Sequence, residues 1–186
     1  MAAFKSPQLR RLNREEWLTA SALLLGVVVY LVVLGVLDRR AEAYFLRLRT
    51  ENPVLYLDQL RESRGFAAFL PAYRELNGFD SFRPQPPNFM VGRWTMRSET
   101  LRLVPGTAPD TCSDPVTFDY GLYLTVESGG VALPVQYRIA GDRVEMKSRD
   151  DAVFDIDLAI YGSQLDHVEF VPPGRSDKVY AYLCGR

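Results

Sequence analysis

Residues 116–127 read VTFDYGLYLTVE, and apolar side chains alternate with other residues along this stretch. In an extended strand the apolar residues would share one face: Phe118, Tyr120, Leu122, Leu124 and Val126. Residues 131–139 and 154–160 repeat the alternation, which is typical of antiparallel strands with one buried face. This periodicity of two indicates that the C-terminal half of the chain is a β domain.

Turn residues separate these runs, and four further segments complete the pattern: residues 93–104, 143–148, 164–171 and 178–183. The sum is about seven short strands at regular spacing, which predicts an antiparallel barrel or a sandwich over residues 89–186. No long helical pattern lies between the strands, and this excludes a parallel sheet because parallel strands need long crossovers.

The first predicted strand opens with Val91-Gly92-Arg93-Trp94, and the meander of strands that follows carries Asp119-Tyr120-Gly121-Leu122-Tyr123 and Tyr137-Arg138-Ile139-Ala140-Gly141-Asp142-Arg143-Val144. Over residues 89–184 this arrangement resembles the small lipocalin-like barrels of bacterial envelope proteins. The resemblance implies an up-and-down meander and, as one hypothesis, an interior that binds a lipid or another hydrophobic ligand. Most residues expected inside are bulky, among them Phe118, Tyr137 and Phe154, which favours a filled barrel.

The chain has two cysteines, Cys112 in the loop after the first strand and Cys184 at the end of the last. In a closed meander the first and last strands are neighbours, so we predict a disulfide between them. The alternative is two free thiols in a cytosolic domain, because structural disulfides belong to oxidising compartments.

Residues 17–37, WLTASALLLGVVVYLVVLGVL, contain no charged side chain. As a helix they would span ~31 Å, the thickness of a bilayer core, with Trp17 as an interfacial anchor. A cleaved signal peptide has a shorter apolar region and a small-residue cleavage site. We therefore predict one uncleaved transmembrane helix, preceded by a cytoplasmic tail at residues 1–16.

The orientation of this helix is not decided by flanking charge, since basic residues are equally frequent on its two sides. The cysteines in the C-terminal part and the increasingly acidic composition toward the C-terminus favour a cytoplasmic N-terminus. The expected location is the bacterial inner membrane, in a single pass, with residues 89–186 in the periplasm.

Between the membrane segment and the β domain, residues 38–81 have helical spacing and form a predicted connector, with a helix start at Asn52-Pro53. A second short helix is expected to begin near Pro71. Phe66, Phe69 and Leu70 make a dense apolar cluster, which would pack on the following domain or on the membrane surface, or serve as a partner interface. Residues 82–88 contain three prolines and are interpreted as an extended linker at a domain boundary.

No pattern of a catalytic or cofactor site emerges from the sequence. Basic and acidic residues number 22 and 23, so a basic footprint for nucleic acid is absent. One histidine and two cysteines exclude a zinc finger and a four-cysteine iron–sulfur centre. Counted from Val168, alternation places His167 on a solvent face and Asp166 on the opposite one, which disfavours a catalytic pair.

These observations predict an α+β membrane protein without enzymatic activity, cofactor or metal. The expected function is that of an accessory or structural subunit of a bacterial membrane complex, in a respiratory, photosynthetic or envelope assembly. Its expected partners are the membrane and other membrane-protein subunits, with lipid as a further candidate and no nucleic acid. The alternative is the lipocalin-like module that binds a hydrophobic ligand.

Overall fold

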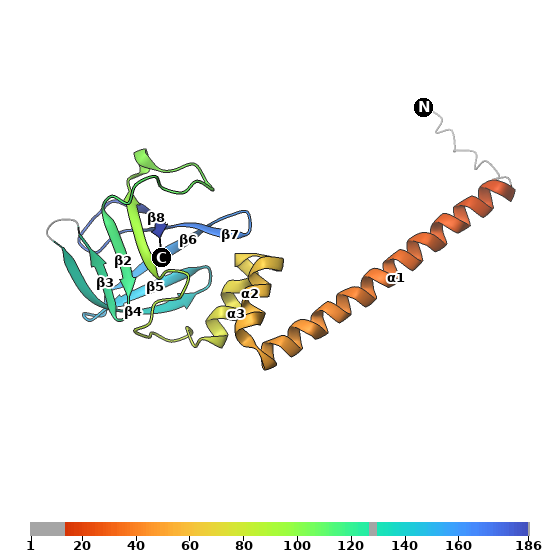
Figure 1. Cartoon of the computed structure of the whole chain (residues 1–186), viewed down its shortest axis with the longest axis horizontal. Coiled ribbons are helices and arrows are strands. Elements are labelled where there is room, and N and C mark those ends of the chain that lie inside the picture. The colour runs from red at the N-terminus through yellow and green to blue at the C-terminus, as the bar shows by residue number, and fades with distance from the viewer. Residues whose placement is uncertain (1–13, 127–129, 186) are drawn as a thin grey trace, which may run out of the picture. The chain divides into compact units, whose positions relative to one another are not determined.

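The computed structural model describes residues 14–126 and 130–185. The chain divides into two compact units, with the division between Glu51 and Asn52. The first contains the long helix α1, and the second contains helices α2 and α3 and an eight-stranded barrel (Figure 1). The division therefore lies well before the proline-rich segment that the sequence suggested as a boundary.

Helix α1, Arg14–Glu51, is a single helix of 38 residues. It continues past residue 37 and ends directly before Asn52-Pro53, because the residue that precedes a proline is disfavoured in helical conformation. Among the described residues it is the one helix long and apolar enough to cross a membrane, and its hydropathy reaches 2.7. Most of the expected tail, residues 1–13, lies outside the described residues.

Helix α2, Pro53–Arg64, begins as predicted: the Asn52 side chain accepts a hydrogen bond from the Leu55 amide at 3.1 Å. Helix α3, Phe66–Leu76, starts five residues earlier than expected and contains Pro71 in its interior. Gly65 separates the two helices with a φ of +79°, and a Cβ at this position would lie 3.1 Å from Ser163 of the barrel. A glycine is thus required both for the turn and for the close approach to the barrel.

The barrel is a closed antiparallel meander in which each strand pairs with the next and β8 pairs with β1. Its strands are β1 Gly92–Arg97, β2 Pro115–Asp119, β3 Leu122–Thr125, β4 Val131–Ala140, β5 Arg143–Ser148, β6 Val153–Tyr161, β7 Gln164–Phe170 and β8 Val179–Gly185. A short 3₁₀ helix, Glu99–Leu101, follows β1. The barrel alternative is thereby confirmed, and closure pairs both edges of each of the eight described strands.

The predicted count of seven strands is wrong because the stretch read as one strand contains two, β2 and β3, which form a hairpin. The Asp119 carboxylate accepts the Tyr120 amide at 2.7 Å, and Gly121 turns the chain at a φ of +66°. The turn reverses which residues face inward: Phe118 pairs with Tyr123, and both are buried. Tyr120, expected inside, is 62% exposed.

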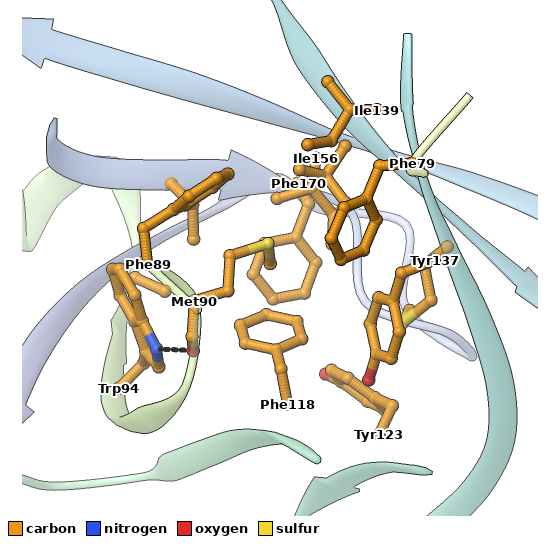
Figure 2. Close-up of a cluster of buried hydrophobic side chains, with 14 of the residues drawn as sticks. Phe79, Phe89, Met90, Trp94, Phe118, Tyr123, Tyr137, Ile139, Ile156 and Phe170 are labelled. Carbon is orange, nitrogen blue, oxygen red and sulfur yellow. Dashed lines mark hydrogen bonds between the residues drawn. The ribbon is translucent and has the colours of Figure 1, made fainter. Parts of the chain in front are cut away.

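Large side chains fill the barrel interior, and Figure 2 shows Met90 beside Phe118 and Phe170, with Tyr123 and Tyr137 on the other side of Phe118. The segment between α3 and β1 closes this interior instead of forming a free linker. Arg83 and Tyr137 exchange two backbone hydrogen bonds, of 3.0 and 2.7 Å, and the Pro84 carbonyl accepts the Gly121 amide.

Candidate functional site

The aromatic cluster predicted as a partner interface is buried in the core. Phe66, Phe69 and Leu70 are 0%, 6% and 4% exposed, and they belong to the same hydrophobic core as the barrel interior. Phe66 contacts Phe69 and Phe89 with ring centroids 5.4 and 5.1 Å apart. The interpretation as a docking surface is therefore not supported, since helices α2 and α3 use these residues to close one side of the barrel domain.

The two cysteines lie together at the seam of the barrel. Cys112 and Cys184 form a disulfide with their Cα atoms 5.7 Å apart. The pairing is as predicted, for the reason given: β1 and β8 are neighbours in the closed meander. Trp17, the expected membrane anchor, lies near the start of α1 and is 65% exposed.

The segment between β1 and β2, residues 98–114, is named here the strap. At 17 residues it is longer than most connections in compact domains, and loops of this length are usually functional or disordered. It crosses the outer face of β7 and β8, where the Leu103 amide donates to the Tyr182 hydroxyl at 3.1 Å. The Gly106 amide donates to the Asp166 carboxylate at 2.7 Å.

A β-bulge in β7 sets the side chains beneath the strap. Ala159 pairs with His167, but the next residue of β6, Ile160, pairs with Leu165, so Asp166 is an extra residue without a partner in the ladder. A bulge changes the direction of side chains next to it. As a result Asp166 and His167 lie side by side, with Oδ2 and Nδ1 2.7 Å apart.

His167 is 3% exposed, so the prediction of a solvent-facing histidine is wrong. Alternation placed it correctly on the outer face of the barrel, opposite Val168, but the strap and the tyrosines of β8 cover that face. The ring stacks on Tyr182 with centroids 4.9 Å apart. Its second nitrogen, Nε2, lies 3.0 Å from a carboxylate oxygen of Glu169.

The carboxylates around the ring have further basic partners. Glu169 also contacts Lys178 at 2.7 Å and Arg102 of the strap at 3.2 Å. Burial alone would raise the pKa of Glu169, but the hydrogen bonds from Lys178 and His167 outweigh it and hold the pKa below its usual range. The Lys178 pKa is raised by the same contact with Glu169.

At its other edge the strap contacts Tyr180. The guanidinium of Arg102 lies 4.6 Å above the centre of this ring. The Tyr180 hydroxyl donates to the Glu99 carboxylate, and this hydrogen bond raises the pKa of the phenol. The strap is thus joined to β7 and β8 by a continuous network of charged and aromatic groups.

The geometry gives His167 the position of a bridge between two carboxylates. Ionised carboxylates only accept hydrogen bonds, so both ring nitrogens must donate for both contacts to form.

No group of three or more histidine, cysteine or acidic side chains suited to holding a metal ion occurs within residues 14–126 and 130–185.

Surface grooves lie on the outside of the barrel domain. One of about 400 Å³ lies between the strap and the β6–β7 turn, lined by Gly106, Tyr161 and Asp166 among others. Another of about 440 Å³ adjoins the disulfide and Arg93.

Alternation and turn signals could not have located the histidine cluster, because the sequence shows neither the bulge nor the path of the strap.

Comparison of the chain with protein-family models, with curated proteins and with solved structures finds no match.

Proposed function

We propose that this chain is a non-catalytic accessory subunit of a bacterial membrane complex, anchored by α1 in a single pass. The respiratory, photosynthetic and envelope assemblies remain the classes of complex concerned. In this proposal α1 binds in the membrane, and the barrel domain contacts the complex from the extracytoplasmic side.

The observation that carries the proposal is the exposed apolar surface of α1. From Trp17 to Leu37 its large apolar side chains are 43% to 73% exposed. Contiguous apolar surface of this extent marks a protein or membrane interaction site, and the length of the segment corresponds to a bilayer core. Lipid and neighbouring helices would both satisfy it.

The contents of the barrel support a contact function over ligand carriage. Trp94, Phe118, Tyr123 and Tyr137 are each no more than 1% exposed, and Met90 is completely buried. A lipid carrier needs an apolar cavity of a few hundred Å³, and here aromatic side chains occupy that space (Figure 2).

The extracytoplasmic position of the barrel rests on the cysteine pair. A disulfide between Cys112 and Cys184 persists in the periplasm and is reduced in the cytosol. In this proposal a single pass of α1 leaves the N-terminus of the chain on the cytoplasmic side.

The test is purification of the tagged full-length chain in mild detergent from its native membranes, with mass spectrometry of the proteins recovered. We expect partner subunits at a constant ratio to the chain and one large species on a native gel. A chain recovered alone, and carrying a lipid or another hydrophobic molecule at equimolar amount, would refute the subunit proposal and support the lipocalin-like alternative.

Two matched variants locate the contact on α1. A Cβ at Gly26 or at Gly35 would have no neighbouring group within 4 Å, so both positions have open space for a larger side chain. Nine residues of helix separate them, about two and a half turns, which places them on opposite faces. We expect one of Gly26→Leu and Gly35→Leu to reduce partner recovery and the other to leave it unchanged. Full recovery with both variants would contradict a contact through these faces.

A further inference from the structure

We propose that the strap, residues 98–114, is a pH-dependent closure over β7 and β8 that is controlled by the proton on His167. It is closed when both ring nitrogens carry a proton, and residues 99–110 open when the ring becomes neutral. This goes beyond the proposed function and does not depend on it.

Two carboxylates and two tyrosines surround the His167 ring. On its own strand His167 faces Asp166 and Glu169, at 2.7 and 3.0 Å. On β8 it faces Tyr182 and Tyr180, with ring centroids 4.9 and 5.9 Å away. Beyond these groups, Arg102 and Lys178 pair with Glu169, and Glu99 accepts the Tyr180 hydroxyl. Lys178 also pairs with Asp157 of β6.

Removal of one proton from the ring changes these contacts. A neutral imidazole donates from one nitrogen and accepts at the other, so one of the two carboxylates would face a lone pair instead of a donor. The Asp166 and His167 side chains are 8% and 4% exposed, and an unsatisfied charged group in such a site is costly. Opening of the strap admits water and removes that cost.

The strap depends directly on these carboxylates. Asp166 accepts the Gly106 amide through one oxygen and the histidine ring through the other. Glu169 holds Arg102 of the strap and His167 through the same oxygen. Reorientation of either carboxylate therefore releases a strap contact.

The far end of the strap is held independently of the histidine. Cys112 is bonded to β8, and the Thr95 hydroxyl donates to the Ser113 carbonyl. Opening would thus be confined to the part before Cys112.

The experiment is hydrogen exchange of the full-length chain in detergent over a pH series, with the ring of this single histidine followed by NMR in the same samples. Amides of strands β4 and β5 correct for the intrinsic pH dependence of exchange. We expect protection of the Leu103 and Gly106 amides to fall by about 10- to 100-fold as the ring loses its proton, the factor for one charge-assisted hydrogen bond. Unchanged strap protection across the titration of His167 would overturn the proposal.

A near-isosteric variant makes the test specific. Asp166→Asn keeps an oxygen for the Gly106 amide and presents an N–H₂ to Nδ1, so a neutral ring satisfies both of its contacts. We expect strap protection in Asp166→Asn to remain constant as the ring titrates. The control is Asp155→Asn, whose side chain is 53% exposed and pairs with Arg143; it should behave as wild type. A pH-dependent loss in Asp166→Asn equal to that of wild type would also refute the mechanism.

Discussion

Phe66→Ala tests whether the helices and the barrel fold as one unit, and its expected cost follows from the structure. Phe66 is completely buried, between Phe69 and Phe89. A buried phenylalanine removes roughly 200 Å² from water. At about 25 cal/mol per Å², with part of the area retained by alanine and a penalty for the cavity, the loss is about 4 kcal/mol.

The assay is urea unfolding of residues 52–186, the second compact unit, under non-reducing conditions. Trp94 is the single tryptophan of this fragment and is 1% exposed inside the barrel. Its fluorescence therefore reports on the barrel, whereas the substitution lies in α3. With an m value of about 2 kcal/mol/M, the midpoint should fall by about 2 M.

The control is Val54→Ala in α2, where the side chain is 70% exposed and a change within about 0.5 kcal/mol is expected. The contrary outcome is that Phe66→Ala leaves the Trp94 transition in place while the helical signal melts at lower urea. That outcome would mean that α2 and α3 form a separate unit attached to an independently stable barrel.

Three further predictions concern the same domain. The fragment of residues 52–186 should show a cooperative melt by circular dichroism. The fragment of residues 88–186 should not, because it lacks the helical part of the core. Equally cooperative melts of the two fragments would contradict a shared core. Glu169→Gln should lower the free energy of unfolding at pH 7. A carboxyl whose native pKa is lowered stabilises the fold above its unfolded pKa and loses that contribution as the pH falls, so the difference in unfolding free energy from wild type should shrink below about pH 4. A difference that stays constant with pH would contradict this prediction. Replacement of both Cys112 and Cys184 by serine should lower the free energy of unfolding by about 4 kcal/mol, since the disulfide closes a loop with a sequence separation of 72 residues. An unchanged urea midpoint would contradict this prediction.

Features that depend on composition or on period could be predicted from the sequence. The uncharged run of residues 17–37 lies within one helix, and most of the alternating runs are strands. The cysteine pairing followed from topology, because closure of a meander brings its first and last strands together. None of these inferences needed knowledge of an individual turn.

The hairpin at Tyr120-Gly121 shows where periodicity fails. Apolar residues continue at even positions through the turn, so the sequence reads as one long strand. The turn shifts the phase, and the buried residue after it is Tyr123 rather than Leu124. The signal available in the sequence was Gly121, since glycine readily adopts the positive φ that this turn needs. Asp119 stabilises the turn by accepting the Tyr120 amide.

The histidine cluster was missed for a related reason with larger consequences. A single extra residue, Asp166, brings a carboxylate to the same face as His167, and strict alternation had placed the two on opposite faces. The strap then covers them through contacts far apart in sequence, such as the Gly106 amide on Asp166. An irregular loop has no period from which its path could be deduced. The charged network around His167 therefore arises where the sequence pattern carries least information, and a bulge beneath a long loop is the kind of departure from regularity that marks a functional element.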